Sequence, residues 1–456
     1  MTAVDTRNEA PSSTLGLGRP RPARTIGCTL AAVTAAAYAI GLGRAFDYDG
    51  SITVGLFVRH GSLLDPFRSV YAFNNQPYFS FVEHLVWSAG GHSEAWMRVV
   101  PIAAGVATVG ILAAWVTARW GSAAGVVAGA VLAANPMFAT LARSVRGYSL
   151  MVLGCTVATI LLADTRSHPE TLTRARKVAY VAGLGIAIGT QFYAVLVLAA
   201  HVAVLVANRA FDAGWRKRII GIAIVGAAPY VGMMSALVTT ARGRKGTFTA
   251  GFPASAAYAV LGHSPVALVV LGAAAAYALG RVGWTRSLAP AVATIALAIV
   301  AIWVLLHPLD LYPRFVVWLV PAVAIATAWS VARHPRAIVV VAIAIVAMAL
   351  TDAASWNTQP IASRTAAHMV EQARADHLHP CATGWDGDAI AGYTSAVPRV
   401  TTPADALRCD VVFGITQRSS TLLSQITCGF RSVHVLNGTL SIVELSHPYP
   451  SRAPSC

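Results

Sequence analysis

Apolar stretches of membrane-spanning length recur along this chain and constrain its fold more than any other feature. The first runs from about Ile26 to Gly43, and about eleven are present in all, each near the length that crosses a ~30 Å hydrocarbon core. The later ones are centred near residues 108, 131, 156, 184, 199, 228, 270, 296, 323 and 343. Of the 456 residues, 56% are hydrophobic and 12% are charged, too apolar for a soluble chain of this length. The sequence therefore predicts an α-helical polytopic membrane protein.

Two of these stretches have a second interpretation. The first also fits a cleaved signal peptide, because Ala37-Tyr38-Ala39 matches a small-x-small site. The polar segment before it is long for a signal peptide, so we favour an uncleaved span. Between Val178 and Ala207 the chain offers one long helix or two helices with a tight turn, and the polar Thr190-Gln191 centre favours two.

Composition divides the chain into three predicted parts. Residues 1–25 are rich in Pro, Ser and Thr and predict a disordered cytoplasmic tail. Residues 26–351 form the predicted transmembrane domain, with a first outer loop at 45–95. Residues 352–456 are polar enough for a small soluble α/β domain, in which 410–415 predicts a buried strand, 420–426 a helix and 432–444 two strands turning at Asn437-Gly438. Asp386 and Asp388 of this domain are interpreted as loop residues and not as a metal site.

Lysine and arginine are concentrated in alternate connections between the apolar stretches. With a cytoplasmic N-terminus, each predicted inner connection is basic, which is the positive-inside pattern. The residues are Arg119; Arg166, Arg174, Arg176 and Lys177; Arg209, Arg216, Lys217 and Arg218; Arg281 and Arg286; Arg333 and Arg336. We expect a multi-pass protein of the cell membrane with an extracytoplasmic C-terminal domain. The net charge of +15 is spread between apolar stretches, which indicates contact with membrane lipids and not with nucleic acid.

Six cations oppose this pattern, because the same topology places them on the outer side next to span ends. They are Arg143, Arg146, Arg242, Arg244, Lys245 and Arg314. Any one of them can extend to outer lipid headgroups. As a set, they are explained more economically by a bound anion.

Four of the six cysteines lie in the C-terminal domain: Cys381, Cys409, Cys428 and Cys456. An even set confined to one domain predicts two disulfides and an oxidising compartment. Cys381 with Cys409 and Cys428 with Cys456 is our preferred pairing of the three that are available. Their spacing matches no metal-ligand template, so we expect no zinc site.

Polar residues whose side chains could take part in catalysis are concentrated in the first outer loop. Asp47 and Asp49 are expected to emerge at the membrane surface, where a carboxylate can act as a general base toward a hydroxyl or can join a metal site. Hydrated loop acids without a function are the alternative, and this alternative has more weight for Asp47 than for Asp49. Amphipathic segments follow and predict short helices on the membrane surface. Glu83-His84 lies within an apolar run, and a structural hydrogen-bonded pair is as reasonable there as a functional one.

The order of several short motifs resembles membrane glycosyltransferases of the GT-C type, especially protein mannosyltransferase-like and aminoarabinose transferase-like families. The motifs are Asp49 after the first span, Asn75-Gln76-Pro77-Tyr78, Ser93–Pro101, Ala134-Asn135-Pro136, Ala142–Leu150 and Tyr312-Pro313-Arg314-Phe315 followed by Pro321. The resemblance covers residues 45–160 well, the middle by hydropathy alone and the C-terminal domain not at all. Gly50, Ser144 and the Asn75-Gln76 pair depart from the residues common in these families.

The resemblance implies a GT-C fold and a hexosyl- or pentosyltransferase. It would move a sugar from a polyprenyl phosphate to a hydroxyl of a glycan, lipid or protein acceptor on the outer face, with inversion. Asp49, or else Asp47, would be the base, and Arg146, Arg143 and Arg314 would hold the donor phosphate without a metal. The resemblance leaves a divalent metal open without favouring it, and it fixes no cofactor. Candidate acceptor or donor contacts are Asn75, Gln76, Tyr78, Glu83, His84, Tyr148, Arg242, Arg244 and Lys245.

Three other functions compete with this one. A ligase that transfers a whole lipid-linked glycan would share the fold and the arginines. A transporter or flippase of lipid-linked sugars predicts charges at the membrane midplane and inverted repeats, and we find neither in the sequence. A structural scaffold with an extracytoplasmic sensor domain is the third.

Overall fold

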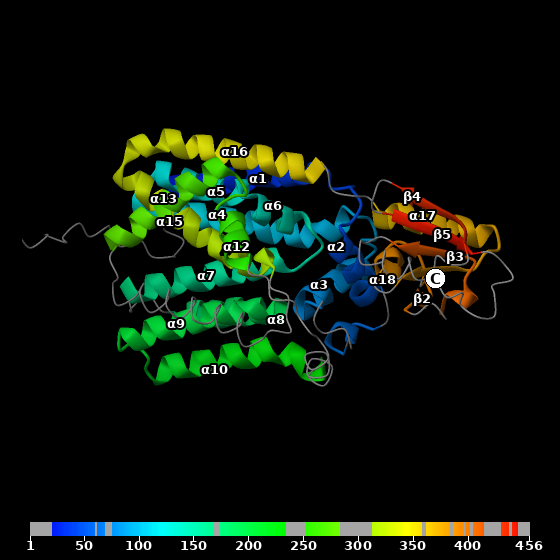
Figure 1. Cartoon of the computed structure of the whole chain (residues 1–456). Helices are drawn as coiled ribbons and strands as arrows, with labels where there is room; N and C mark the ends of the chain where they lie inside the picture. Colours follow the sequence, from blue (N-terminus) through cyan, green and yellow to red (C-terminus); the bar gives the residue numbers. More distant parts are fainter. Residues whose placement is uncertain are drawn as a thin grey trace, which may run out of the picture. The chain divides into compact units, whose positions relative to one another are not determined.

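The computed structural model separates the chain into two compact units (Figure 1). The described residues are 21–59, 62–68, 75–167, 173–233, 251–282, 312–357, 362–383, 386–395, 397–401, 405–414, 430–436 and 440–445. The helical unit comprises Met1–Ile40, Pro101–Arg143 and Gly147–Trp356. The loop–tail unit comprises Gly41–Val100, Ser144–Arg146 and Asn357–Cys456. This division differs from the linear one expected from the sequence, because the first loop groups with the C-terminal domain.

Apolar helices make up the described part of the helical unit. They are α1 (Arg21–Ala39), α4 (Val99–Trp120), α5 (Ser122–Ala134), α6 (Pro136–Arg143), α7 (Tyr148–Ser167), α8 (Arg174–Thr190), α9 (Val195–Ala207), α10 (Ala213–Ala227), α12 (Phe252–Val260), α13 (Pro265–Val282), α15 (Val320–Arg333) and α16 (Ile338–Asn357). Short 3₁₀ segments extend or join them at η5 (Phe192–Ala194), η6 (Ala228–Met233), η7 (Pro313–Leu319) and η8 (Pro335–Ala337).

Four of the described helical stretches are long and apolar enough to cross a membrane: Trp96–Trp120, Tyr148–Thr165, Pro313–Arg333 and Pro335–Trp356. The number rises to six if each bent pair counts as one span, with α5 and α6 meeting at 63° and α12 and α13 at 86°. The chain is thus a multi-pass membrane protein. The expected count of about eleven spans stays a prediction. A helix lies near each expected centre that falls within the described residues, and the centre near residue 296 lies outside them.

The stretch from Val178 to Ala207 forms two helices, as the polar centre predicted. Helix α8 ends at Thr190, and Gln191 has an extended backbone (φ −147°, ψ 111°) before η5 and α9 begin. In Figure 1, α7, α8 and α10 lie side by side. Glycines permit the contact between α7 and α8, because a Cβ on Gly154 would lie 2.2 Å from the carbonyl oxygen of Gly183.

The C-terminal part of the loop–tail unit is built on a five-stranded mixed sheet with the order β2-β1-β3-β5-β4. The strands are β1 (Pro380–Thr383), β2 (Arg399–Val400), β3 (Val411–Gly414), β4 (Phe430–Leu436) and β5 (Leu440–Leu445), and the helices are α17 (Ala362–Ala375) and α18 (Asp386–Ala391). Strand β1 pairs in parallel with β2 and β3, whereas β5 is antiparallel to β3 and β4. The predicted strand at 410–415 and the predicted pair at 432–444 correspond to β3, β4 and β5. The helix predicted at 420–426 lies outside the described residues.

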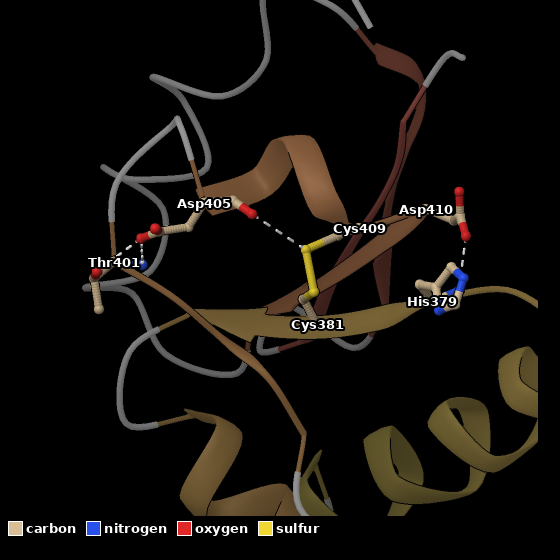
Figure 2. Close-up of a disulfide and its surroundings, with 6 residues drawn as sticks. All are labelled: His379, Cys381, Thr401, Asp405, Cys409 and Asp410. Carbon is tan, nitrogen blue, oxygen red and sulfur yellow. Dashed lines mark hydrogen bonds between the residues drawn. A yellow bond between two sulfur atoms is a disulfide. The ribbon is translucent and has the colours of Figure 1, made fainter. Parts of the chain in front are cut away.

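A disulfide joins Cys381 on β1 to Cys409, two residues before β3 (Figure 2). Their Cα atoms are 5.8 Å apart, and these are the two cysteines that the sequence-based pairing put together. Nearby, Asp410 accepts a 2.7 Å hydrogen bond from the backbone N–H of His379, which ties the same two segments. Cys428 and Cys456 lie outside the described residues.

The first loop contributes short helices to the loop–tail unit: α2 (Tyr48–Thr53), the π-helical η1 (Val54–Val58), η2 (Asp65–Phe67), α3 (Pro77–Ser88) and η3 (Trp96–Arg98). Ile52 of α2 belongs to the same buried cluster as Val370, Ala389 and Phe413 of the C-terminal domain. Burial of this shared apolar surface is the physical reason that loop and domain form one unit.

Candidate catalytic site in the first loop

Asp47 caps the N-terminus of α2. Its backbone is extended (φ −64°, ψ 168°), and its Oδ1 accepts a 3.0 Å hydrogen bond from the backbone N–H of Gly50. This is the geometry that an aspartate adopts at the start of a helix. Its other oxygen, Oδ2, accepts a 2.8 Å hydrogen bond from the Ser144 hydroxyl. Both carboxylate oxygens of Asp47 are thus engaged by protein groups.

Burial raises the pKa of Asp47 above its ordinary value, and the charge of Asp49 raises this pKa further. The Ser144 hydrogen bond and the charges of Arg146 and Arg98 act in the opposite direction. Asp47 therefore lies among one acid and two cations, all within the loop–tail unit.

Asp49 occupies the first turn of α2 and is half-buried. The unpaired N–H groups at a helix start favour a negative charge there. Its backbone carbonyl accepts a 2.9 Å hydrogen bond from the Thr53 hydroxyl one turn later. The N-terminal end of α2 thus carries two carboxylates: Asp47 caps the helix, and Asp49 lies in its first turn.

Arg146 belongs to the three-residue segment that joins the loop–tail unit from the middle of the sequence. Its side chain is 4% exposed, and its Nη1 donates a 3.2 Å hydrogen bond to the Thr53 hydroxyl. Ser144 and Arg146 of one short segment therefore reach α2 at two points. The structure brings together Asp47, Asp49 and Arg146, three of the predicted site residues.

Arg143 is engaged within the helical unit. It forms an ion pair with Asp352 on α16, and its Nε donates a 3.1 Å hydrogen bond to the carbonyl of Ala139. Its guanidinium lies 4.2 Å from the ring centre of Trp356 and 5.5 Å from that of Tyr38. An arginine held in this way braces α6 against α16 and α1.

Two other predicted residues also lie in the helical unit. Arg314 is half-buried in η7, with its guanidinium 4.6 Å from the ring centre of Tyr312. Tyr148 begins α7 and is buried. Arg242, Arg244 and Lys245 lie outside the described residues.

Asn75, Gln76 and His84 are buried in the loop–tail unit. Asn75 Oδ1 accepts a 2.9 Å hydrogen bond from Ser80, and its amide nitrogen donates to the carbonyl of Pro66. His84 Nδ1 is 2.7 Å from the carbonyl oxygen of Val58, so it holds α3 against η1. Tyr78, at the start of α3, is half-buried, with its ring centre 6.2 Å from that of Phe67. These contacts organise the loop around α3.

Glu83 is fully buried on α3 and does not pair with its neighbour His84. Neither of its carboxylate oxygens has a hydrogen-bond partner among the described residues. Burial raises the pKa of Glu83 well above its ordinary value. An uncharged carboxylic acid is the form that such surroundings favour.

Sequence reasoning did not single out Arg98, although it lies within one of the motifs. Its side chain is 2% exposed and donates hydrogen bonds to four backbone carbonyls, of Leu42, Arg44, Ala45 and Glu94, at 2.7 to 3.3 Å. Its guanidinium also lies 5.4 Å from the ring centre of Phe46. Arg98 thus fixes the backbone that leads into Asp47. Its position directly before the apolar stretch centred near residue 108, on the predicted outer side, is the sequence signal that could have identified it.

Among the described residues, no three His, Cys, Asp or Glu side chains are grouped so that they could hold a metal ion.

Two solved structures of ArnT from Cupriavidus metallidurans share the fold of this chain. The apo structure matches with a TM-score of 0.59 and 14% identity over 92% of this chain and 97% of ArnT. The structure bound to undecaprenyl phosphate matches with a TM-score of 0.59 and 13% identity over 93% of this chain and 98% of ArnT. No family model and no curated protein matches the chain. The resemblance drawn from the sequence is confirmed at the level of the fold.

Proposed function

We propose that this protein is a glycosyltransferase that moves a sugar from a polyprenyl phosphate to an acceptor hydroxyl on the outer face of the membrane. The observation that carries the proposal is the acid–cation cluster of α2. Asp47 caps α2 and Asp49 lies in its first turn. The buried Arg146 donates a hydrogen bond to the hydroxyl of Thr53, which is one turn after Asp49. The GT-C fold shared with a protein that binds undecaprenyl phosphate supports the choice of donor.

The chemistry assigns one role to each charge. The acceptor oxygen bonds to the anomeric carbon as Asp49 takes its proton, and the bond between that carbon and the phosphate oxygen breaks. The polyprenyl phosphate leaves with one more negative charge, which Arg146 stabilises through charge-assisted hydrogen bonds. One base and no covalent intermediate give inversion. The half-buried position of Asp49 and the engagement of both oxygens of Asp47 favour Asp49 as the base.

A ligase for whole lipid-linked glycans is the second candidate, because a phosphate leaving group and an arginine would serve it equally. The two reactions differ in the transferred group and in whether a monophosphate or a diphosphate lipid is released. A transporter or flippase would release neither.

The test measures the lipid product, so it does not require knowledge of the acceptor. Purified protein in membranes would be given a panel of radiolabelled polyprenyl-phosphate hexoses and pentoses together with an extract of cell-envelope acceptors. We expect release of free polyprenyl phosphate from one donor. Release of a polyprenyl diphosphate would favour the ligase, and sugar movement across sealed vesicles with no free lipid would favour the transporter.

Asp49→Asn is the matching variant, and it should lower release by about 10²-fold or more while the donor still binds. Asp65→Asn is its control, because Asp65, like Asp49, is an acid in the first turn of a short helix of the same loop, η2, and it accepts a 2.8 Å hydrogen bond from the N–H of Ser62. The control should keep normal release. Normal release by Asp49→Asn would exclude Asp49 as the base.

A further inference from the structure

The helix that carries Asp49 is packed into the C-terminal domain. Tyr48 and Ile52 are four residues apart and thus on one side of α2, and both contact the buried cluster of that domain. Asp49 and Thr53 are the next pair on the helix, and Arg146 bonds to Thr53. One side of α2 is therefore anchored in the C-terminal domain, while the adjacent side carries the proposed chemistry.

A polar link fixes the anchored side. The Tyr48 hydroxyl donates a 3.0 Å hydrogen bond to Asp386 Oδ1 at the start of α18, and the Thr383 hydroxyl donates a 2.8 Å hydrogen bond to Asp386 Oδ2. Asp386 is 1% exposed, so this link is shielded from water. Burial and the neighbouring Asp386 charge raise the pKa of Tyr48. The Tyr48 hydroxyl therefore stays protonated and can donate this hydrogen bond.

Two glycines allow α2 and its extension to approach α18 closely. A Cβ added to Gly55 would lie 2.4 Å from the carbonyl oxygen of Asp388, and one added to Gly392 would lie 2.5 Å from that of Ser51. At the other end of α2, the backbone N–H of Phe46 donates to the hydroxyl of Tyr393, whose ring centre is 5.2 Å from that of Phe46. The segment from Phe46 to Gly55 is thus held by the C-terminal domain before, within and after α2.

We propose that Asp386 is a positioning residue for Asp49 and acts through Tyr48. The inference rests on the proposed function, since it assigns the C-terminal domain a part in aiming the catalytic carboxylate. Tyr48 and Asp49 are consecutive, so the rotation of α2 that satisfies the hydrogen bond to Asp386 also sets the direction of the Asp49 side chain, about 100° around the helix. A small misorientation of a base lowers the rate more than it lowers substrate affinity.

The experiment is a double-mutant cycle on release of polyprenyl phosphate with Tyr48→Phe, Asp386→Asn and both together. Tyr48→Phe keeps the ring and removes only the hydroxyl. We expect kcat to fall about tenfold for each single variant with KM for the donor nearly unchanged, and the double variant to be no slower than either single one. Asp405→Asn is the matched control: Asp405 accepts 2.9 and 2.8 Å hydrogen bonds from Thr401 within the same domain and should leave kcat unchanged.

Hydrogen exchange of the full-length protein provides a readout that does not depend on activity. Peptides covering residues 46–58 should exchange faster in Tyr48→Phe and Asp386→Asn than in the wild type, and at the wild-type rate in Asp405→Asn. Unchanged kcat in Tyr48→Phe, or losses that multiply in the double variant, would overturn the inference while an inactive Asp49→Asn left the proposed function intact. Full activity of Asp49→Asn would overturn both.

Discussion

The Ser144 hydroxyl donates a 2.8 Å hydrogen bond to Asp47 Oδ2 across a sequence separation of 97 residues. The bond joins the segment before α7 to the cap of α2. Together with the bond from Arg146 to Thr53, it explains why three residues from the middle of the chain belong to the loop–tail unit. Asp47 is therefore part of a built helix start and not a hydrated loop residue.

Substitution of Asp47 should separate its capping function from catalysis. Asp47→Asn keeps a good N-cap and should retain most of the stability and most of the release of polyprenyl phosphate. Asp47→Ala removes the cap and the acceptor for Ser144, and should lower the free energy of unfolding by about 0.5–2 kcal/mol. Thermal unfolding and lipid release would be measured for both. Loss of release in Asp47→Asn with unchanged stability would instead make Asp47 the base.

Removal of the Arg98 side chain should destabilise the loop–tail unit. Arg98→Leu leaves several part-buried backbone carbonyls without their donor, and each charged hydrogen bond of this kind contributes about 1.5–3 kcal/mol. We expect a clear fall in the thermal midpoint and faster hydrogen exchange over residues 41–50. Arg68→Leu removes an exposed arginine of the same loop and serves as the control. Equal midpoints for the two variants would show that the carbonyl contacts contribute little.

Glu83 should make the stability of the protein depend on pH. Its pKa in the folded protein is raised above the value of 4.5 for an unperturbed glutamic acid, so the folded state binds more protons above that pH than the unfolded state does. In acid, Glu83 is protonated in both states and does not lower the stability. As the pH rises from 4.5 through the folded-state pKa, the free energy of unfolding falls, because the buried side chain must either keep its proton or become charged. Glu83→Gln should raise the thermal midpoint near neutral pH and flatten its pH profile.

The control for Glu83 is Glu371→Gln, which changes a carboxyl that is 56% exposed and paired with Arg374. Its profile should follow that of the wild type. A Glu83→Gln profile as steep as the wild type would show that the buried carboxyl is neutralised by another group.

A double substitution should decide whether Arg143 is a brace. Arg143→Met leaves the half-buried Asp352 without its partner and should cost about 3–5 kcal/mol of stability. Arg143→Met with Asp352→Leu replaces the whole pair by apolar groups and should recover most of this stability. If Arg143 only braces α6 and α16, the double variant also recovers lipid release. A stable double variant with no release would place Arg143 at the donor phosphate.

Membrane residence and the order of helices were readable from the sequence, because apolar length and break residues are local properties. The split at Thr190-Gln191 is an example, since the length of the apolar stretch and its polar centre can both be read from the sequence. The strand at β3 was readable for the same reason. The sidedness inferred from basic connections stays a prediction.

The contacts of the candidate site were not readable, because they join segments that are distant in sequence. Nothing near Asp47 indicates Ser144, and nothing near Tyr48 indicates Asp386. Arg143 and Arg146 lie three residues apart and looked equivalent, yet one pairs with Asp352 in the helical unit and the other with Thr53 in the loop–tail unit. Which partner an arginine meets is a tertiary property that charge and spacing do not encode.

The 338 residues between Tyr48 and Asp386 also set an order of events during synthesis. At the usual pace of translation, roughly 20 to 70 s pass between the appearance of α2 and that of the residue that fixes it. Throughout that interval the first loop lacks its lasting partner. A chain stalled before residue 386 should therefore be cut by added protease within residues 46–58, whereas the released chain should resist. We therefore expect products that end before residue 386 to lack glycosyltransferase activity, even with every membrane helix in place.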